Sequence, residues 1–93
     1  MRVARKYIIS GRVQGVGFRY FAERRANQLG IIGYVKNCGN GSVEVYAIGD
    51  PTSLEEFRSL LTEGPASARV TNIAESEEPV DKRRASFVVE GGW

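Results

Sequence analysis

Hydrophobic and polar residues alternate along the first part of the chain. Between residues 3 and 13, Tyr7 and Ile9 fall on one face of an extended segment, whereas Ala4 and Ile8 fall on the other. Such alternation predicts a β-strand. Further short runs rich in β-branched and aromatic residues predict strands over residues 31–37, 42–48, 70–78 and 87–89.

Two other segments repeat their apolar residues at helical spacing. The first covers residues 18–29 and is followed by a glycine, which is a common helix stop. The second has apolar residues at positions 54, 57, 60 and 61 and ends before Gly64. Two capping boxes fit the start of this second helix, Ser53 with Glu56 or Thr52 with Glu55.

The order of these elements is β-α-β-β-α-β, with room for one extra edge strand. Asn40-Gly41 between two strands is a hairpin signal, because both residues tolerate positive φ. The charged residues 77–84 are expected to form a solvated connector. The order predicts an α+β fold of ferredoxin-like topology over a single domain, residues 1–93, with two helices packed on one face of a mostly antiparallel four- to five-stranded sheet.

Composition narrows the chemistry. The chain has no histidine, which excludes histidine nucleophiles, Ser-His-Asp triads and histidine-containing metal sites. A net charge of +2 suits a small anionic ligand and is too weak for a nucleic-acid footprint. The single Cys38 cannot form an intrachain disulfide, and the apolar run at 7–9 is too short for a membrane span. We therefore expect a cytoplasmic protein with no membrane or nucleic-acid partner.

The segment from Gly11 to Arg19 contains the strongest chemical signal. Two glycines lie between a strand and a helix N-terminus, where main-chain N–H groups and the helix dipole favour a phosphate-sized anion. Arg19 in the first helical turn can bind the same anion. A tight turn with a solvated arginine is the alternative, and Asn37, at the end of a predicted strand, either bonds the turn backbone or holds a water.

Two blocks of sequence resemble the signatures of the acylphosphatase family. The first is Val13-Gln14-Gly15-Val16-Gly17-Phe18-Arg19, and the second is Gly33-Tyr34-Val35-Lys36-Asn37 followed by Asn40-Gly41-Ser42-Val43-Glu44. The blocks have the family's order and spacing, and the resemblance extends over most of the chain. Tyr34 stands where the family often has tryptophan, and Asn40 where it often has aspartate.

The resemblance implies a metal-free enzyme that hydrolyses acyl phosphates to carboxylate and inorganic phosphate. Arg19 matches the family's phosphate-binding arginine, and Asn37 matches its water-orienting asparagine. The phosphate cradle would be formed by the main-chain amides of Gln14, Gly15, Val16, Gly17 and Phe18. We expect no cofactor, competition by phosphate or sulfate, a monomer, and proton transfer from the attacking water to a phosphate oxygen of the substrate.

Two other classes of function have to be weighed against this interpretation. RNA-recognition domains share the element order, and Tyr7 and Tyr46 could stack on bases, but the third strand has no Lys/Arg-Gly-Phe pattern. Acylphosphatase-like domains also occur inside larger carbamoyl-transferring enzymes, and we expect a free-standing enzyme. Cys38 is expected to be a turn residue, because a cysteine phosphatase needs an arginine where Glu44 stands.

Overall fold

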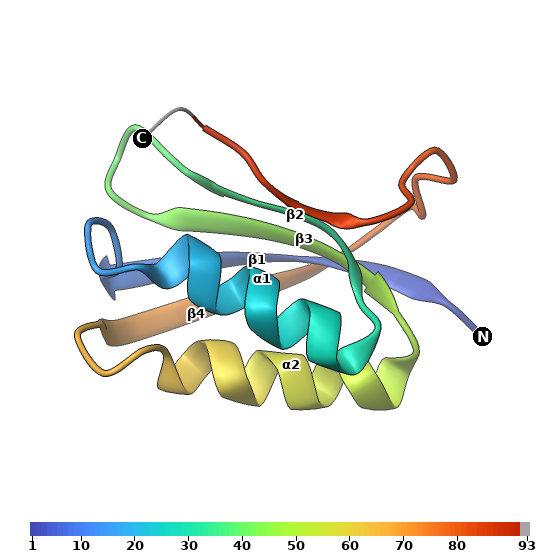
Figure 1. Ribbon diagram of the computed structural model, residues 1–93, viewed down its shortest axis with the longest axis horizontal. Coiled ribbons are helices and arrows are strands. Elements are labelled where there is room, and N and C mark those ends of the chain that lie inside the picture. Colours follow the sequence, from blue (N-terminus) through green and yellow to red (C-terminus); the bar gives the residue numbers. More distant parts are fainter. Residues whose placement is uncertain (92–93) are drawn as a thin grey trace.

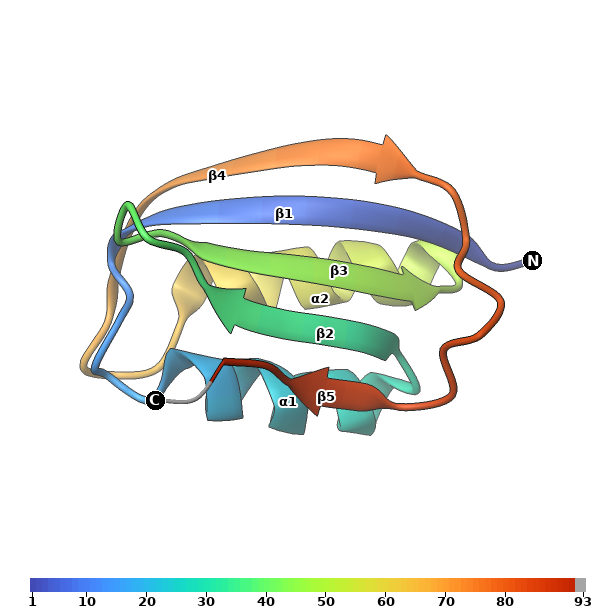
Figure 2. The same ribbon diagram turned by 90° about the horizontal axis from the view of Figure 1, so that it is seen from above.

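The computed structural model describes residues 1–91, which form a five-stranded sheet with two helices. Figure 2 shows the strands side by side, with both helices behind them. The sheet order is β4-β1-β3-β2-β5. The elements in chain order are β1 (Val3–Arg12), α1 (Phe18–Leu29), β2 (Ile32–Asn37), β3 (Val43–Gly49), α2 (Pro51–Glu63), β4 (Arg69–Glu78) and β5 (Phe87–Val89).

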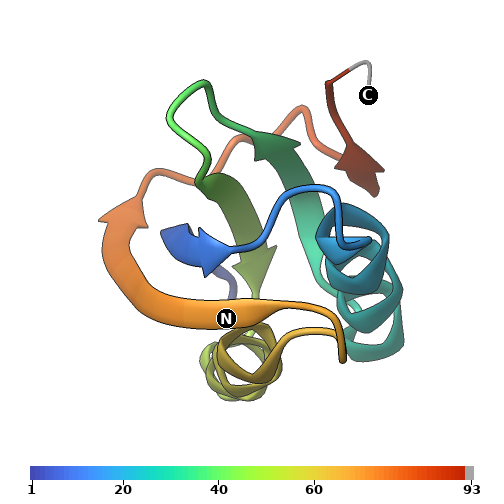
Figure 3. The same cartoon turned by 90° about the vertical axis from the view of Figure 1, so that its left-hand side faces the viewer.

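Three of the four strand pairings are antiparallel. Strand β1 pairs with β3 and with β4, and β2 pairs with β3, all in antiparallel register. Strand β5 adds to the outer edge of β2 in parallel, with Tyr34 opposite Val88. The predicted ferredoxin-like α+β sandwich, with two helices on one face of a mostly antiparallel sheet, is confirmed (Figures 1 and 3).

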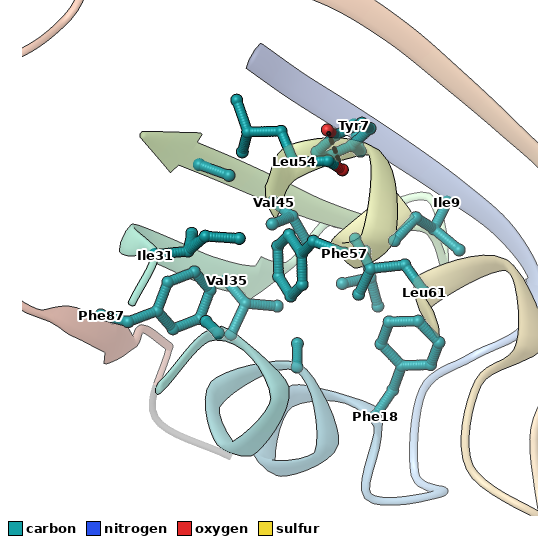
Figure 4. Close-up of a cluster of buried hydrophobic side chains, with 14 of the residues drawn as sticks. Tyr7, Ile9, Phe18, Ile31, Val35, Val45, Leu54, Phe57, Leu61 and Phe87 are labelled. Carbon is teal, nitrogen blue, oxygen red and sulfur yellow. Dashed lines mark hydrogen bonds between the residues drawn. The ribbon is translucent and has the colours of Figure 1, made fainter. Parts of the chain in front are cut away.

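The main hydrophobic core lies between the helices and the sheet (Figure 4). Helix α1 contributes Phe18 and helix α2 contributes Phe57, both at or below 1% exposure. Tyr7 of β1 is fully buried there and packs edge-on against Phe57. This burial explains why the predicted amphipathic spacing of both helices and of β1 is observed, and it leaves Tyr7 unable to stack on a base.

The opposite face of the sheet has a smaller core, which the connector after β4 covers. Tyr46 and Tyr34 stack with ring centroids 5.5 Å apart, and Val80 packs against this cluster. The Tyr46 hydroxyl donates to the carbonyl of Pro79 and accepts from the N–H of Asp81. The expectation of a solvated connector is therefore wrong for Val80 and Asp81, which are half-buried because Tyr46 and the contact of Val80 with the smaller core anchor them to the sheet.

Helix α2 begins earlier than either predicted capping box allows. Asp50 is the N-cap, and its carboxylate accepts from the N–H of Thr52 at 3.1 Å. Pro51 occupies the first turn, where its fixed φ suits a helix and its missing N–H costs nothing. Both predicted boxes are wrong, since Thr52 and Ser53 lie inside the helix. The Asp50-Pro51 pair, which follows directly on β3, starts the helix.

Candidate active site

The candidate site lies at one end of the sandwich, where three segments between or after the strands and helices come together. The loop between β1 and α1, the hairpin between β2 and β3, and the segment after β5 all reach this end (Figure 1, left). Hydrogen bonds join the loop to the hairpin and helix α1 to the segment after β5. The chain therefore brings together residues that are far apart in the sequence.

The loop between β1 and α1 depends on two glycines for its backbone shape. Gly15 and Gly17 have φ values of 73° and 78°, in the left-handed region that other residues rarely adopt. A Cβ atom at either position would meet nothing within 4 Å, so the glycines are needed for conformation and not for space. Gly17 is the N-cap of α1, and no side chain in the described part of the chain caps this helix. The first-turn N–H groups are thus left for other acceptors.

A cavity of about 380 Å³ opens beside this loop. Most of the predicted site residues line it, together with two that were not predicted. Val16 is the exception, because its side chain packs against the main core. The lining residues are Val13, Gln14, Gly15, Gly17, Phe18, Arg19, Tyr20 and Asn37. The structure thus places Arg19 and Asn37, which are 18 positions apart in the sequence, around one hollow.

Gln14 ties the loop to the hairpin through its side chain. Its amide nitrogen donates to the carbonyl of Cys38 at 2.8 Å and to the carbonyl of Ser42 at 2.9 Å. Within the hairpin, the Asn40 carboxamide oxygen accepts from both the N–H and the hydroxyl of Ser42. The loop and the hairpin consequently form one hydrogen-bonded unit, with Cys38 in the turn as predicted.

Asn37 is the last residue of β2 and immediately precedes this hairpin. Its main chain pairs with Val43, which fixes the direction in which the side chain leaves the strand. The residue is half-buried and lines the cavity. Among residues 1–91 its side-chain amide has no hydrogen-bond partner, so both its donor and its acceptor are available to a ligand or a water.

Arg19 reaches from the first turn of α1 to the segment that follows β5. Its Nη1 atom donates to the carbonyl of Glu90 at 3.0 Å and to the carbonyl of Gly91 at 3.2 Å. Both acceptors are main-chain carbonyl oxygens, so these two contacts hold the guanidinium beside the cavity. A positive charge thus lies at the cavity, next to the positive end of the helix dipole, and both favour an anion.

Sequence reasoning missed two features of this site. Tyr20 lines the cavity. The sequence could have indicated this, because Tyr20 is an aromatic residue that falls outside the apolar face of the predicted helix. The side-chain role of Gln14 had no signal in the sequence, because its partners lie 24 and 28 residues away. Within residues 1–91 no cluster of three or more His, Cys, Asp or Glu side chains is arranged to hold a metal ion. No helix in the described range is long and apolar enough to span a membrane.

Fold and site together define a small α+β sandwich with a pocket at a helix N-terminus that an arginine and an asparagine line. The acylphosphatase family model matches residues 5–89. An acylphosphatase of Actinobacillus succinogenes is 46% identical over 88 residues, covering 95% of this chain and 98% of the relative. The chain belongs to the acylphosphatase family.

Solved structures agree with this assignment. An acylphosphatase from Coxiella burnetii superposes with a TM-score of 0.91 at 35% identity, covering 96% of this chain and 93% of its own. An acylphosphatase from Bacillus subtilis gives a TM-score of 0.91 at 34% identity, with 98% of this chain and 100% of its own covered. The family resemblance inferred from the two sequence blocks is therefore confirmed.

Proposed function

We propose that this protein hydrolyses acyl phosphates to a carboxylate and inorganic phosphate, without a metal ion. The observation that carries the proposal is a single cavity lined by a glycine-containing loop at a helix N-terminus, an arginine and an asparagine. Family membership supports the reaction class. The roles of the individual residues rest on the geometry of this cavity and on general chemistry.

In the proposed complex the phosphoryl group binds at the loop. The main-chain N–H groups of residues 14–18 and the start of α1 donate to its oxygens, and the Arg19 guanidinium donates to them as well. Because Gly15 and Gly17 set the conformation of this loop, little reorganisation accompanies the build-up of charge on the equatorial oxygens. The two carbonyls that hold Nη1 restrict the guanidinium and reduce the entropy lost on binding.

The water that attacks phosphorus is oriented by Asn37. Its amide oxygen accepts a hydrogen bond from the water. This bond directs a lone pair of the water toward phosphorus, on the side opposite the acyl oxygen. The oxygen–phosphorus bond forms while the bond from phosphorus to the acyl oxygen breaks, and the carboxylate leaves with the electron pair. A phosphoryl oxygen of the substrate takes the proton that the water loses. Because the conjugate acid of the leaving group has a pKa of about 4, no protein acid is needed.

Steady-state hydrolysis of acetyl phosphate in the presence of a chelator tests this proposal. We expect Arg19→Ala to raise KM and the inhibition constants of phosphate and sulfate, and to lower kcat. We expect Asn37→Ala to lower kcat by about 100-fold, the usual loss for one positioned transition-state group, while KM changes little.

Matched controls lie on the exposed side of the same helix. Arg24→Ala and Asn27→Ala remove exposed side chains of the same types, and both variants should retain wild-type kinetics. Activity that disappears with the chelator would contradict the metal-free mechanism. An equal rise of KM in Arg19→Ala and Asn37→Ala would show that the two roles are wrongly assigned.

A further inference from the structure

Tyr20 is an exposed aromatic residue that lines the cavity. Among residues 1–91, the large hydrophobic residues with high exposure are Met1, Tyr20 and Val88, and of these only Tyr20 lines the cavity. It is 61% exposed, whereas Phe18 and Phe21 on the same helix are at most 5% exposed. Tyr20 therefore contributes little to the core, and its ring presents apolar surface to whatever occupies the cavity.

The other apolar residues of the cavity offer almost no surface. Val13 and Phe18 are each 1% exposed, because their side chains belong to the main core. The remaining lining residues are glycines or polar side chains. Tyr20 is thus the principal apolar contact available to a ligand in this part of the described structure.

The position of Tyr20 relative to Arg19 suits the second half of an acyl phosphate. The two residues are consecutive in the first turn of α1, so their side chains leave the helix about 100° apart and border the cavity from neighbouring directions. A cavity of about 380 Å³ falls within the range of sites for organic ligands, so it has room for an acyl group beside a phosphate. With phosphate at the loop and Arg19, the part of the cavity that Tyr20 lines is left for the acyl group.

We propose that Tyr20 forms the subsite for the acyl group and that the enzyme favours acyl phosphates with a flat aromatic acyl group over acetyl phosphate. This inference rests on the proposed function. An aromatic acyl group stacks on the exposed ring in the offset or edge-on geometries that aromatic pairs prefer, whereas a methyl group covers only a small part of it. The ring thus supplies selectivity, and the loop and Arg19 supply affinity for phosphate.

The test compares kcat/KM for benzoyl phosphate and acetyl phosphate in wild type, Tyr20→Phe and Tyr20→Ala. The ratio of the two values should fall by about 3- to 10-fold in Tyr20→Ala, the range expected for loss of one aromatic pair. Tyr20→Phe should keep the ratio, since it keeps the ring. Val88→Thr removes an exposed apolar residue outside the cavity, and its kcat/KM values for both substrates should equal those of wild type.

The outcomes separate this inference from the proposed function. Wild type that hydrolyses neither compound overturns both. Wild type that hydrolyses both, with the same ratio in Tyr20→Ala, overturns the acyl subsite and leaves the proposed function standing. A ratio that falls equally in Tyr20→Phe assigns the effect to the hydroxyl group and also overturns the stacking subsite. Because Tyr20 is exposed, the thermal midpoint of each variant should match that of wild type and show that the fold is intact.

Discussion

Gln14 holds the glycine-containing loop against the β2–β3 hairpin, and replacing it with methionine tests how much this link contributes. Gln14→Met keeps an unbranched side chain of similar length and removes only the amide. Two hydrogen bonds are lost, to the carbonyls of Cys38 and Ser42. Each carbonyl keeps another donor, because Gly41 N–H bonds to Cys38 and Cys38 N–H bonds to Ser42. The cost is then the net value of two hydrogen bonds and not that of an orphaned acceptor.

That net value is about 1 kcal/mol for each hydrogen bond, so the free energy of unfolding should fall by about 2 kcal/mol. For a domain of this size the thermal midpoint should drop by about 8 to 16 °C. Activity should fall as well, because the position of the loop relative to Asn37 would no longer be fixed. Loss of alignment by about 1 Å can cost up to 100-fold in rate, so we expect a loss of kcat of at least about ten-fold.

The assays are urea denaturation, a thermal scan and steady-state kinetics. Gln28→Met is the matched control, since Gln28 is exposed on α1 and, among the described residues, its side chain bonds only to the half-buried Arg25 side chain. It should stay within about 0.5 kcal/mol of wild type. Equal stability of the two variants would refute the hydrogen-bond reasoning. A stability loss in Gln14→Met with full activity would show that the link supports the fold and not the site.

Two further predictions concern tyrosines outside the site. Tyr46→Phe removes the hydroxyl group that bonds to Pro79 and Asp81, so the free energy of unfolding should fall by about 1 to 2 kcal/mol. Trypsin should also cleave the 79–84 connector faster than in wild type. Unchanged cleavage would contradict the anchoring of this connector by Tyr46. Burial, with the nearby Glu75 carboxylate, raises the pKa of Tyr7 to about 12. Since this pKa lies above the ordinary value of about 10, the contribution of the neutral Tyr7 side chain to stability is complete below pH 10 and is lost as the pH rises toward 12. Thermal midpoints measured between pH 9 and 11 should therefore fall less steeply in Tyr7→Phe than in wild type.

Local patterns predicted most of the fold. The spacing of Phe18, Phe21 and Ala22 identified α1 because these side chains do pack on the core, and a glycine at position 30 ends this helix in a left-handed conformation. Errors arose where two signals overlapped at the same residues. Asp50-Pro51 both follows the end of β3 and starts α2, whereas the two predicted capping boxes placed the start two or three residues later. The anchoring of the connector was missed because its partner, Tyr46, lies 33 and 35 residues away in the chain.

For the candidate site, too, the features that are local in the sequence could be predicted, and those that depend on distant residues could not. Glycines before a helix and an arginine in its first turn are neighbours in the sequence, so their placement around one cavity could be predicted locally. Asn37 reaches the same cavity only through the sheet, and the sequence linked it to Arg19 by family resemblance alone. The amide link from Gln14 and the exposed ring of Tyr20 depend on three-dimensional packing, which no spacing rule encodes.

The contact of Arg19 with Glu90 and Gly91 makes the site a late product of folding. It closes a loop of 71 or 72 residues, and the short β5 that positions these carbonyls adds to the sheet in parallel, at its outer edge. Contacts between such distant segments form slowly, because chain entropy is lost before they are made. Refolding chains can thus acquire both helices and the local β2–β3 hairpin before this guanidinium is in place. Recovery of enzymatic turnover should lag behind recovery of the circular dichroism signal.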